Sequence, residues 1–241
     1  MAQPGIGRSV EGVHAVTAAV DAGRVRRLRV ERRRIDTLAE LVDRARDAGA
    51  VIDEVDDVRP HAETTAPQGV VAECRPVATV PLGALAKSDR PALMVLDHIQ
   101  DPQNLGAVAR SAWAAGITGL VVSADRSAPL SAAAFKAAAG AFEHVPVAIV
   151  RSIPDALRSL STAGVWSVGL DAGSSTSLFG LDLFTEPVAV VVGAEGRGLS
   201  RLVAERCDVI ASIPMHPGVE SLNASVAAAL AAFEVARIRG G

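Results

Sequence analysis

The sequence predicts an α/β protein with a mostly parallel sheet in its carboxyl-terminal part and a small α/β domain before it. Short apolar runs alternate with helix-like segments from about residue 92 to the end. Runs such as Ala92 to Leu96 and Val188 to Val192 are apolar throughout, as strands buried on both faces are. A proline-rich stretch, 76–91, separates this alternation from a shorter pattern before it.

The amino-terminal part divides into a tail, a small domain and a linker. Residues 1–8 are expected to form a flexible tail and residues 9–75 the domain. Its predicted elements are a helix Gly12 to Val20, a strand Val25 to Val30, a helix Asp36 to Ala48 ended by Gly49, and strands Val51 to Val55 and Val70 to Cys74. Residues 76–91 are expected to be a linker, because three prolines and a glycine interrupt any periodicity.

Residues 92–241 are expected to form the second domain. Its predicted strands are Leu93 to Leu96, Gly119 to Val122, Val145 to Val150, Val165 to Leu170, Val188 to Val192 and Val209 to Ile213. Its predicted helices are Leu105 to Ala115, Ser131 to Phe142, Pro154 to Ser161, Ser200 to Arg206 and Ser221 to Arg239. Ser152 is placed as the N-cap of the third of these helices, with proline in the first turn.

Composition excludes several classes of protein. With 241 residues, 49% of them hydrophobic, the chain can bury a sizeable core. No apolar run reaches the roughly 18 residues of a membrane helix, and we expect a cytoplasmic protein without a membrane partner. Cys74 and Cys207 lie in unrelated segments, which predicts neither a disulfide nor a metal site. Trp113 and Trp166 are expected in the core. The glycine-rich fingerprints of dinucleotide and triphosphate sites are missing from the sequence.

Three polar clusters follow apolar strands and indicate a functional site. They are Asn104 to Arg110, Gly193 to Gly198, and the run from Ile213-Pro214-Met215 to Ser221-Leu222-Asn223-Ala224-Ser225. Ligand sites of open α/β sheets lie beyond the carboxyl ends of the strands, so these clusters are expected to meet at one edge of the sheet. Taken alone, each has an ordinary structural explanation, such as a helix cap, a tight turn or a solvated side chain.

The three clusters, in this order, resemble the motifs of the SPOUT-class RNA 2'-O-methyltransferases of the TrmH type. The likeness rests on Asp101-Pro102-Gln103-Asn104-Leu105-Gly106 through Arg110, Gly193-Ala194-Glu195-Gly196, and Ile213-Pro214-Met215 with Ser221-Leu222-Asn223. It extends to Gly12-Val13-His14-Ala15-Val16 and Gln68-Gly69-Val70-Val71-Ala72, and so covers nearly the whole chain.

The resemblance implies a particular fold and chemistry. The carboxyl-terminal sheet is expected to carry a deep trefoil knot, and the amino-terminal unit to be an L30e-like RNA-binding domain. S-adenosylmethionine is the implied cofactor, held largely by main-chain groups. Matching positions place it against Leu170, Asp171, Gly193, Ile213, Met215 and Leu222. The implied protein is a homodimer whose site is completed across the interface, and its implied substrate is a guanosine ribose of 23S rRNA, free or in a ribosome assembly intermediate.

Five residues are the candidates for the methyl-transfer step: Arg110, Asn104, Glu195, Ser221 and Asn223. A guanidinium is a poor general base, so Arg110 is expected to stabilise the developing alkoxide. Asn104 is expected to orient Arg110 or the ribose, and Glu195 to hold a guanidinium or a substrate group. Asn104 and Ser221 are equally compatible with plain helix caps.

An arginine-rich segment is the candidate RNA-binding surface. Arg24, Arg26, Arg32 and Arg33 belong to a cluster of seven arginines with a single acid, Glu31. Alternating strand residues put several of them on one face, which suits phosphate contacts. The alternative is a charged edge strand whose arginines are neutralised by the acids of residues 53–57.

Other functions stay open at this stage. Methylation of tRNA ribose or of another rRNA position, as in resistance methylases, fits the same motifs. A non-catalytic RNA-binding protein of ribosome assembly with the same fold is the alternative from another class, and intact Arg110, Glu195 and Asn223 speak against it.

Overall fold

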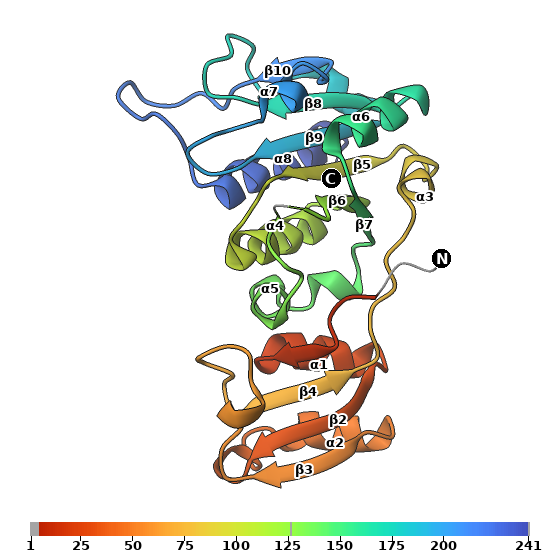
Figure 1. The fold of residues 1–241 in the computed structure, drawn as a ribbon, viewed down its shortest axis with the longest axis vertical. Helices are drawn as coiled ribbons and strands as arrows, with labels where there is room; N and C mark the ends of the chain where they lie inside the picture. Colours follow the sequence, from red (N-terminus) through yellow and green to blue (C-terminus); the bar gives the residue numbers. More distant parts are fainter. Residues whose placement is uncertain (1–4, 126, 241) are drawn as a thin grey trace.

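Two α/β units are stacked along the long axis of the protein in the computed structural model (Figure 1). The structure describes residues 5–125 and 127–240, so the first four residues of the predicted tail, Arg126 and the last residue lie outside the described part of the chain. Each unit has its own sheet, one of four strands and one of six. The predicted α/β class is confirmed. In the described part of the chain, no helix has the length and apolar character that crossing a membrane requires.

The amino-terminal unit is a mixed sheet with two helices. Its strands are β1 (Ser9–Glu11), β2 (Val25–Glu31), β3 (Val51–Val55) and β4 (Val70–Cys74), in the order β1-β4-β2-β3. Only the β2–β3 pair is parallel. Helices α1 (Val13–Asp21) and α2 (Ala39–Asp47) pack against it, and short 3-10 turns cover Arg32–Arg34 and Arg59–His61. Helix α2 begins later than predicted, because no side chain caps its start.

The carboxyl-terminal unit is a fully parallel sheet, as predicted. Its strands are β5 (Ala92–Asp97), β6 (Gly119–Ser123), β7 (Val147–Val150), β8 (Trp166–Leu170), β9 (Val188–Gly193) and β10 (Val209–Ala211), in the order β10-β8-β9-β5-β6-β7. Every residue of β5, β6 and β9 is buried, which explains their unbroken apolar character.

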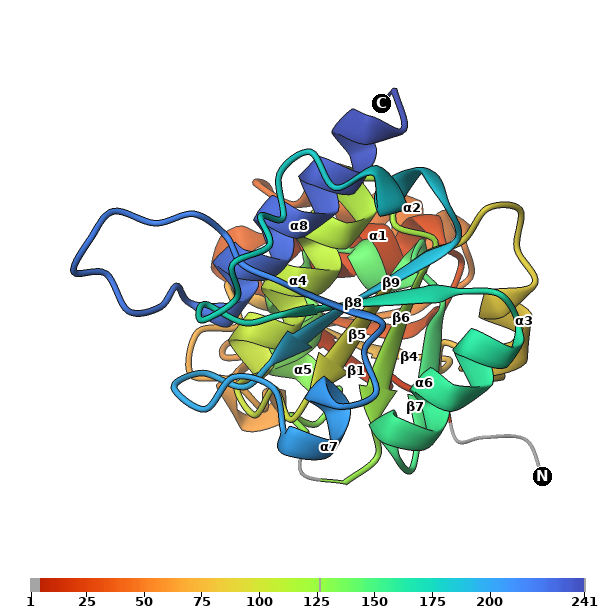
Figure 2. The same cartoon turned by 90° about the horizontal axis from the view of Figure 1, so that it is seen from above.

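Helices cover both faces of this sheet (Figure 2). One face carries α4 (Pro102–Ala114), α5 (Ala132–Ala138) and α8 (Ala224–Ile238), and the other carries α3 (Leu82–Ala86), α6 (Ile153–Thr162) and α7 (Arg201–Ala204). The remaining short 3-10 turns are Ala141–Glu143 and Asp182–Thr185. The trefoil knot that the resemblance implies stays a prediction.

Among the predicted helices of the carboxyl-terminal unit, the largest differences from the structure are in α4, α5 and α8, and each has a local cause. Helix α4 starts early because the Asp101 side chain accepts a hydrogen bond from the Gln103 N–H and caps it. The predicted helix 131–142 is broken where Ala139 and Gly140 adopt positive φ angles of 49° and 98°. The last helix starts at Ala224 instead of Ser221, because Asn223 is its cap.

The two units share a continuous apolar core, so the predicted tail and linker need correction. Ile6 is buried, and it exchanges two backbone hydrogen bonds with Val77, one from each N–H to the other carbonyl. Residues 5–8 are therefore not a flexible tail. Within residues 76–91, helix α3 buries Leu85 beneath the six-stranded sheet. Phe135 of α5 belongs to the core that continues into the amino-terminal unit. The segment 76–91 is therefore part of the packing as well as a connection.

Candidate active site

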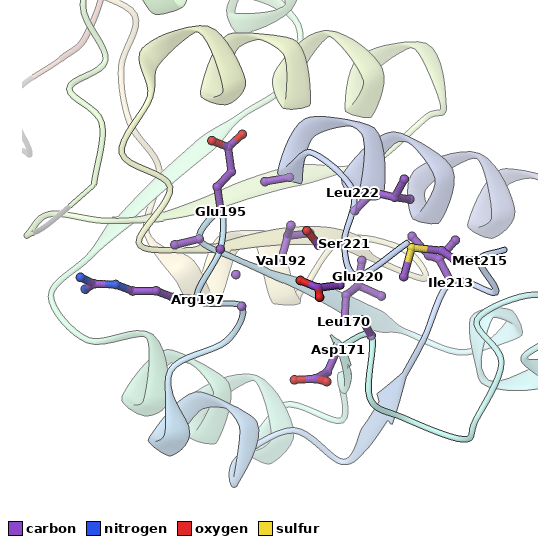
Figure 3. A pocket seen from close by; sticks show the side chains of 17 residues that line it. Leu170, Asp171, Val192, Glu195, Arg197, Ile213, Met215, Glu220, Ser221 and Leu222 are labelled. Atoms are coloured by element: carbon purple, nitrogen blue, oxygen red, sulfur yellow. The ribbon is translucent and has the colours of Figure 1, made fainter. Parts of the chain in front are cut away.

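A pocket lies beyond the carboxyl ends of β8, β9 and β10, where sheet topology predicts a ligand site (Figure 3). Its volume is about 400 Å³, within the range of small-molecule sites. All six residues predicted to contact the cofactor line it: Leu170, Asp171, Gly193, Ile213, Met215 and Leu222. They come from three segments far apart in the sequence, which the parallel sheet brings to one edge.

Gly193 is required by the close approach of two backbone segments. A Cβ atom at this position would lie 2.1 Å from the carbonyl carbon of Gly198, which is backbone and cannot rotate away. The loop between them is a tight turn in which Gly196 and Gly198 have φ angles of 70° and 64°. The glycine-rich sequence therefore shapes the pocket wall through its backbone.

A buried carboxylate fixes the end of the same loop, and sequence analysis missed it. Asp97, the last residue of β5, is almost fully buried. One of its oxygens accepts a hydrogen bond of 2.8 Å from the Ser200 N–H at the start of α7, and the other lies 2.6 Å from His98 Nδ1. The available signal was an acidic residue directly ending a fully apolar strand, which marks a carboxylate with a structural partner.

Asn104, Glu195 and Asn223 form a hydrogen-bonded triad that joins the three motifs. Glu195 Oε1 accepts from Asn104 Nδ2 at 2.5 Å and from Asn223 Nδ2 at 2.6 Å. Asn223 Nδ2 also donates to Asn104 Oδ1 at 3.1 Å. Figure 3 shows Glu195 pointing toward α4 and away from Met215. The predicted contact of Glu195 with a guanidinium is replaced by two amide contacts.

Helix capping fixes the orientation of this triad. Asn223 Oδ1 accepts hydrogen bonds from the Ser225 N–H at 2.8 Å and the Val226 N–H at 3.3 Å, so its Nδ2 must face Asn104 and Glu195. The prediction that Asn104 and Ser221 could be plain caps is wrong. Asp101 caps α4, and Ser221 lies before the last helix, where it lines the pocket.

Arg110 is not brought together with the other candidate catalytic residues. It projects from α4 into a separate groove, lined also by Gln103 and Lys136, and does not line the cofactor pocket. Asn104 donates to Glu195 and not to Arg110, so of its two expected roles only that of orienting the ribose stays a prediction. Within one chain the structure thus assembles the pocket and the triad, but not the arginine.

The predicted RNA-binding arginines are separated in the structure. Arg24 is buried, and its guanidinium donates to Glu143 Oε2 at 2.7 Å, to the Gly7 carbonyl at 3.0 Å and to the Arg75 carbonyl. It joins the two units and is not available to a phosphate, so we remove it from the predicted RNA surface.

The other three arginines of that prediction are exposed. Arg32 lies 3.6 Å from Asp56, one of the acids of residues 53–57 that were expected to neutralise the arginines. Arg33 donates to Glu31, within the arginine-rich segment itself, at 2.7 Å. Arg26 has no ion pair among the described residues. The arginine-rich segment is therefore largely a set of paired charges.

The charges around the pocket fit S-adenosylmethionine. Asp171, Glu195 and Glu220 line it, with Arg197 as the one cationic side chain in its described lining. An excess of carboxylates suits a ligand with a sulfonium and an ammonium group, and a guanidinium suits its carboxylate. Leu170, Ile213, Met215 and Leu222 supply apolar surface beside exposed backbone. Glu220 and Arg197 were not among the predicted contacts.

The thiols take no part in this arrangement. Burial raises the pKa of Cys74 to about 11 and that of Cys207 to about 12, so both stay protonated near neutrality. Both are free cysteines in the structure.

Family profiles match both units of the chain. The profile described as the SpoU rRNA Methylase family matches residues 91–233, and the one described as RNA 2'-O ribose methyltransferase substrate binding matches residues 9–80. The chain belongs to the SpoU rRNA methylase family.

Individual proteins extend this similarity. The chain is 38% identical to the 23S rRNA (guanosine-2'-O-)-methyltransferase RlmB of Shewanella oneidensis over 95% of its own length and 96% of that protein's length. It is 40% identical to an uncharacterized tRNA/rRNA methyltransferase of Synechocystis over 95% of its length, but spans only 62% of that relative. The SpoU methyltransferase AviRb of Streptomyces viridochromogenes, solved with AdoMet, aligns with a TM-score of 0.80 at 28% identity, over 97% of this chain and 91% of that one.

Proposed function

We propose that this protein transfers the methyl group of S-adenosylmethionine to a ribose 2'-hydroxyl of RNA, most specifically of a guanosine in 23S rRNA. The observation that carries the proposal is the pocket at the sheet edge, where two of the three motifs meet with all six expected cofactor contacts in its lining. The first motif joins them through the hydrogen bond from Asn104 to Glu195. The RlmB relative, matched over nearly its full length, supports the rRNA substrate, and the AdoMet-bound AviRb structure supports the cofactor. We place the enzyme in the cytoplasm.

The proposed reaction needs alignment of three atoms and a place for one proton. S-adenosylmethionine bound in the pocket would supply an electrophilic methyl group on its sulfonium. In-line displacement by the ribose 2'-oxygen would release a neutral thioether, and the hydroxyl proton would pass to water or to an RNA phosphate. Glu195, held by two amides, forms the wall between the cofactor pocket and a smaller cavity of about 240 Å³ that Asn104 also lines. This cavity is positioned to receive the ribose. Ser221, in the pocket lining, is placed to contact either ligand.

The position of Arg110 supports a homodimeric enzyme. Arg110 lies in a groove away from its own cofactor pocket, so it serves best by completing the pocket of a second copy. Val226, Leu230 and Phe233 form an exposed apolar stripe at helical spacing on α8, with Phe233 52% exposed. The alanines of the same helix, such as Ala228 and Ala232, are buried in their own chain. The larger exposed residues are therefore the proposed interface.

Another exposed apolar residue lies on α4. Trp113 of α4, which was expected in the core, is 45% exposed and stacks on His144 with ring centroids 4.2 Å apart. Trp166 is also exposed, so neither tryptophan is a core residue. Light scattering should give a mass near twice 24.7 kDa, and Phe233→Asp should shift it to the monomer.

The test of the cofactor proposal uses two neighbouring glycines. In Gly193→Ala, a Cβ meets the Gly198 backbone, and affinity for S-adenosylmethionine should fall at least tenfold, which corresponds to about 1.4 kcal/mol. Gly196→Ala is the matched control: nothing lies within 4 Å of the added Cβ, and the cost is limited to its positive φ. Calorimetric titration, with a thermal melt for each variant, separates lost binding from lost folding.

The substrate is tested by mapping ribose methylation. Purified protein, S-adenosylmethionine and 23S rRNA or tRNA transcripts should give a 2'-O-methyl guanosine in the rRNA, read as a reverse-transcription stop at low nucleotide concentration. A stop in tRNA alone would replace the rRNA assignment by the tRNA one. Cofactor binding absent from a folded protein would instead favour the non-catalytic assembly protein.

A further inference from the structure

Two grooves meet at the loop of residues 63–69, which precedes β4. The first groove, of about 480 Å³, lies between the units and is lined by His14, Arg110 and Lys136. The second, of about 580 Å³, lies on the amino-terminal unit and is lined by Arg33, Arg34 and Arg59. Both are lined by Thr65, Ala66 and Gln68, so this loop is their common wall.

The loop is held rigidly from three sides. Glu11, fully buried in β1, accepts hydrogen bonds from the Glu63 N–H and from both the N–H and the hydroxyl of Thr64. Gln68 adopts a φ of 62°, rare for a residue with a side chain, and its Oε1 accepts from the Val13 N–H at 3.0 Å.

The third contact crosses between the two units. The Lys136 ammonium, on α5, donates to the Ala66 carbonyl. A strained, exposed loop with this many fixed contacts is typical of a preorganised binding element.

The walls of the two grooves carry excess positive charge. Five cationic side chains line them in the described part of the chain, against one carboxylate, that of Glu31: the cations are Arg33, Arg34, Arg59, Arg110 and Lys136. This contrasts with the net charge of −3 for the whole protein.

The arginines of the second groove are not equally available. Arg33 and Arg59 are paired with Glu31 and Asp57. Arg34 Nε is buried and has no hydrogen-bond partner among the described residues. Arg34 also lines the groove and, unlike Arg33 and Arg59, has no ion pair among the described residues, so its guanidinium is the strongest candidate to receive an anionic ligand here.

We propose that the two grooves form one track for the sugar-phosphate backbone of the substrate RNA, with phosphates near Arg34 and Lys136 on either side of the loop 63–69. The proposal rests on the proposed methyl transfer to RNA, which supplies the polyanion. Cationic side chains with no phenylalanine, tyrosine or tryptophan in the described lining suit phosphate contacts rather than base stacking. The track ends at Arg110, the candidate catalytic residue.

The orientation of the loop agrees with this path. In Figure 1 the loop before β4 lies on the same side of the protein as the carboxyl ends of β5 and β9, where the cofactor pocket opens. The loop therefore lies on the side of the protein that carries the active-site edge.

Three substitutions test the track through RNA binding. Arg34→Gln and Lys136→Gln each remove one proposed phosphate contact. Each should therefore lower the slope of log affinity against log salt concentration by about one unit. Ala66→Glu places a carboxylate on the exposed wall shared by both grooves and should weaken binding more than either. The probe is a fluorescein-labelled hairpin RNA, measured by anisotropy at several salt concentrations.

Matched controls lie on α6, on the opposite face of the six-stranded sheet from α4 and α5. Arg158→Gln removes an equal charge from an exposed arginine, and Ala163→Glu adds an equal charge at an exposed alanine that follows the helix. Both should leave affinity and salt slope within error of wild type. Thermal melts and S-adenosylmethionine titrations confirm that each variant keeps its fold and its cofactor pocket.

The outcomes distinguish the track from the methyl-transfer proposal. Weaker RNA binding in the three groove variants, with normal cofactor affinity, supports the track. Wild-type affinity and slope in both Arg34→Gln and Ala66→Glu would overturn it, while rRNA methylation by the wild-type protein would still stand. If the groove variants bind RNA more weakly than the wild type, but the wild type binds no S-adenosylmethionine, the track is supported and methyl transfer is overturned.

Discussion

The carboxyl edge of the six-stranded sheet and the arginine-rich strand of the amino-terminal unit show opposite relations between sequence and structure. At the sheet edge, residues from positions 170 to 222 line one pocket, as predicted. In the arginine-rich segment, residues close in the sequence have different surroundings. Arg24, just before β2, is buried between the units, whereas Arg27 and Arg29 on β2 pair with Asp53. Proximity in sequence was the poorer guide to a shared site.

The difference has a physical origin. Carboxyl ends of parallel strands must share an edge, so topology fixes where motif backbones lie, whatever their side chains do. A charged side chain has several angstroms of reach and pairs with an opposite charge that packing brings within that reach, which can come from another strand or from the other unit. Backbone-defined sites are therefore more readily predicted than charge patches.

Breaking the joint between the units should have the largest effect. Arg24→Ala leaves Glu143 buried without its ion-pair partner and removes donors to two carbonyl groups. It should lower the free energy of unfolding by about 3 to 5 kcal/mol, measured by urea denaturation. Arg26→Ala, two residues away and exposed, should change it by less than about 0.5 kcal/mol. If both substitutions lowered the free energy of unfolding equally, Arg24 would not be the residue that joins the two units.

Arg110 tests the part of the active site that one chain does not assemble. Arg110→Ala should slow single-turnover methylation about a hundredfold to a thousandfold, or about 3 to 4 kcal/mol, by removing one donor to the developing alkoxide. Arg110→Lys should not restore the rate, because an ammonium lacks the planar fork of donors. Affinity for S-adenosylmethionine should be unchanged, since Arg110 lies outside the pocket. Near-normal turnover of the alanine variant would exclude Arg110 from the reaction.

The triad allows capping to be separated from motif contact. Asn223→Asp keeps an acceptor for the first turn of α8, so the helix stays capped, but replaces the amide donor with a carboxylate facing Glu195. The methylation rate should fall, because the activation free energy should rise by about 1 to 3 kcal/mol. Ser152→Asn, a cap exchange at α6 away from the triad and from both cavities, is the control and should be nearly neutral. Wild-type turnover of Asn223→Asp would show that Asn223 serves only as the cap of α8.

The smallest expected effect is a pH dependence of stability at the far end of α8. The hydrogen bond from Arg237, followed by that from the Gly180 N–H, lowers the pKa of the Glu234 carboxyl against the opposing effect of burial. A lowered pKa stabilises the fold above the ordinary value of about 4.5, and this contribution is lost as the pH falls through the lower folded value.

Glu234→Gln tests this assignment. The substitution should cost about 1 kcal/mol in free energy of unfolding near neutral pH, measured by urea denaturation, and less below about pH 4. Cofactor binding near neutral pH should not change, because Glu234 lies outside the pocket. A stability difference that stays constant with pH would contradict the assignment.

The sequence by itself determined the class of fold, the strands and the edge on which the site lies. Strands Val51–Val55 and Val70–Cys74 have their predicted bounds, because apolar runs that end at turn residues define both ends locally. Motif residues such as Gly193 and Met215 fall in the pocket because strand direction carries them there.

Only the tertiary structure decided which partners the polar side chains take. It joined Asn104 to Glu195 instead of to Arg110, buried Arg24 against Glu143, and gave the loop of residues 63–69 its anchors on Glu11 and Lys136. Each of these contacts joins residues more than fifty positions apart. Local propensity acts along the chain, whereas a hydrogen bond or an ion pair depends on distances that exist only after the strands and helices have packed.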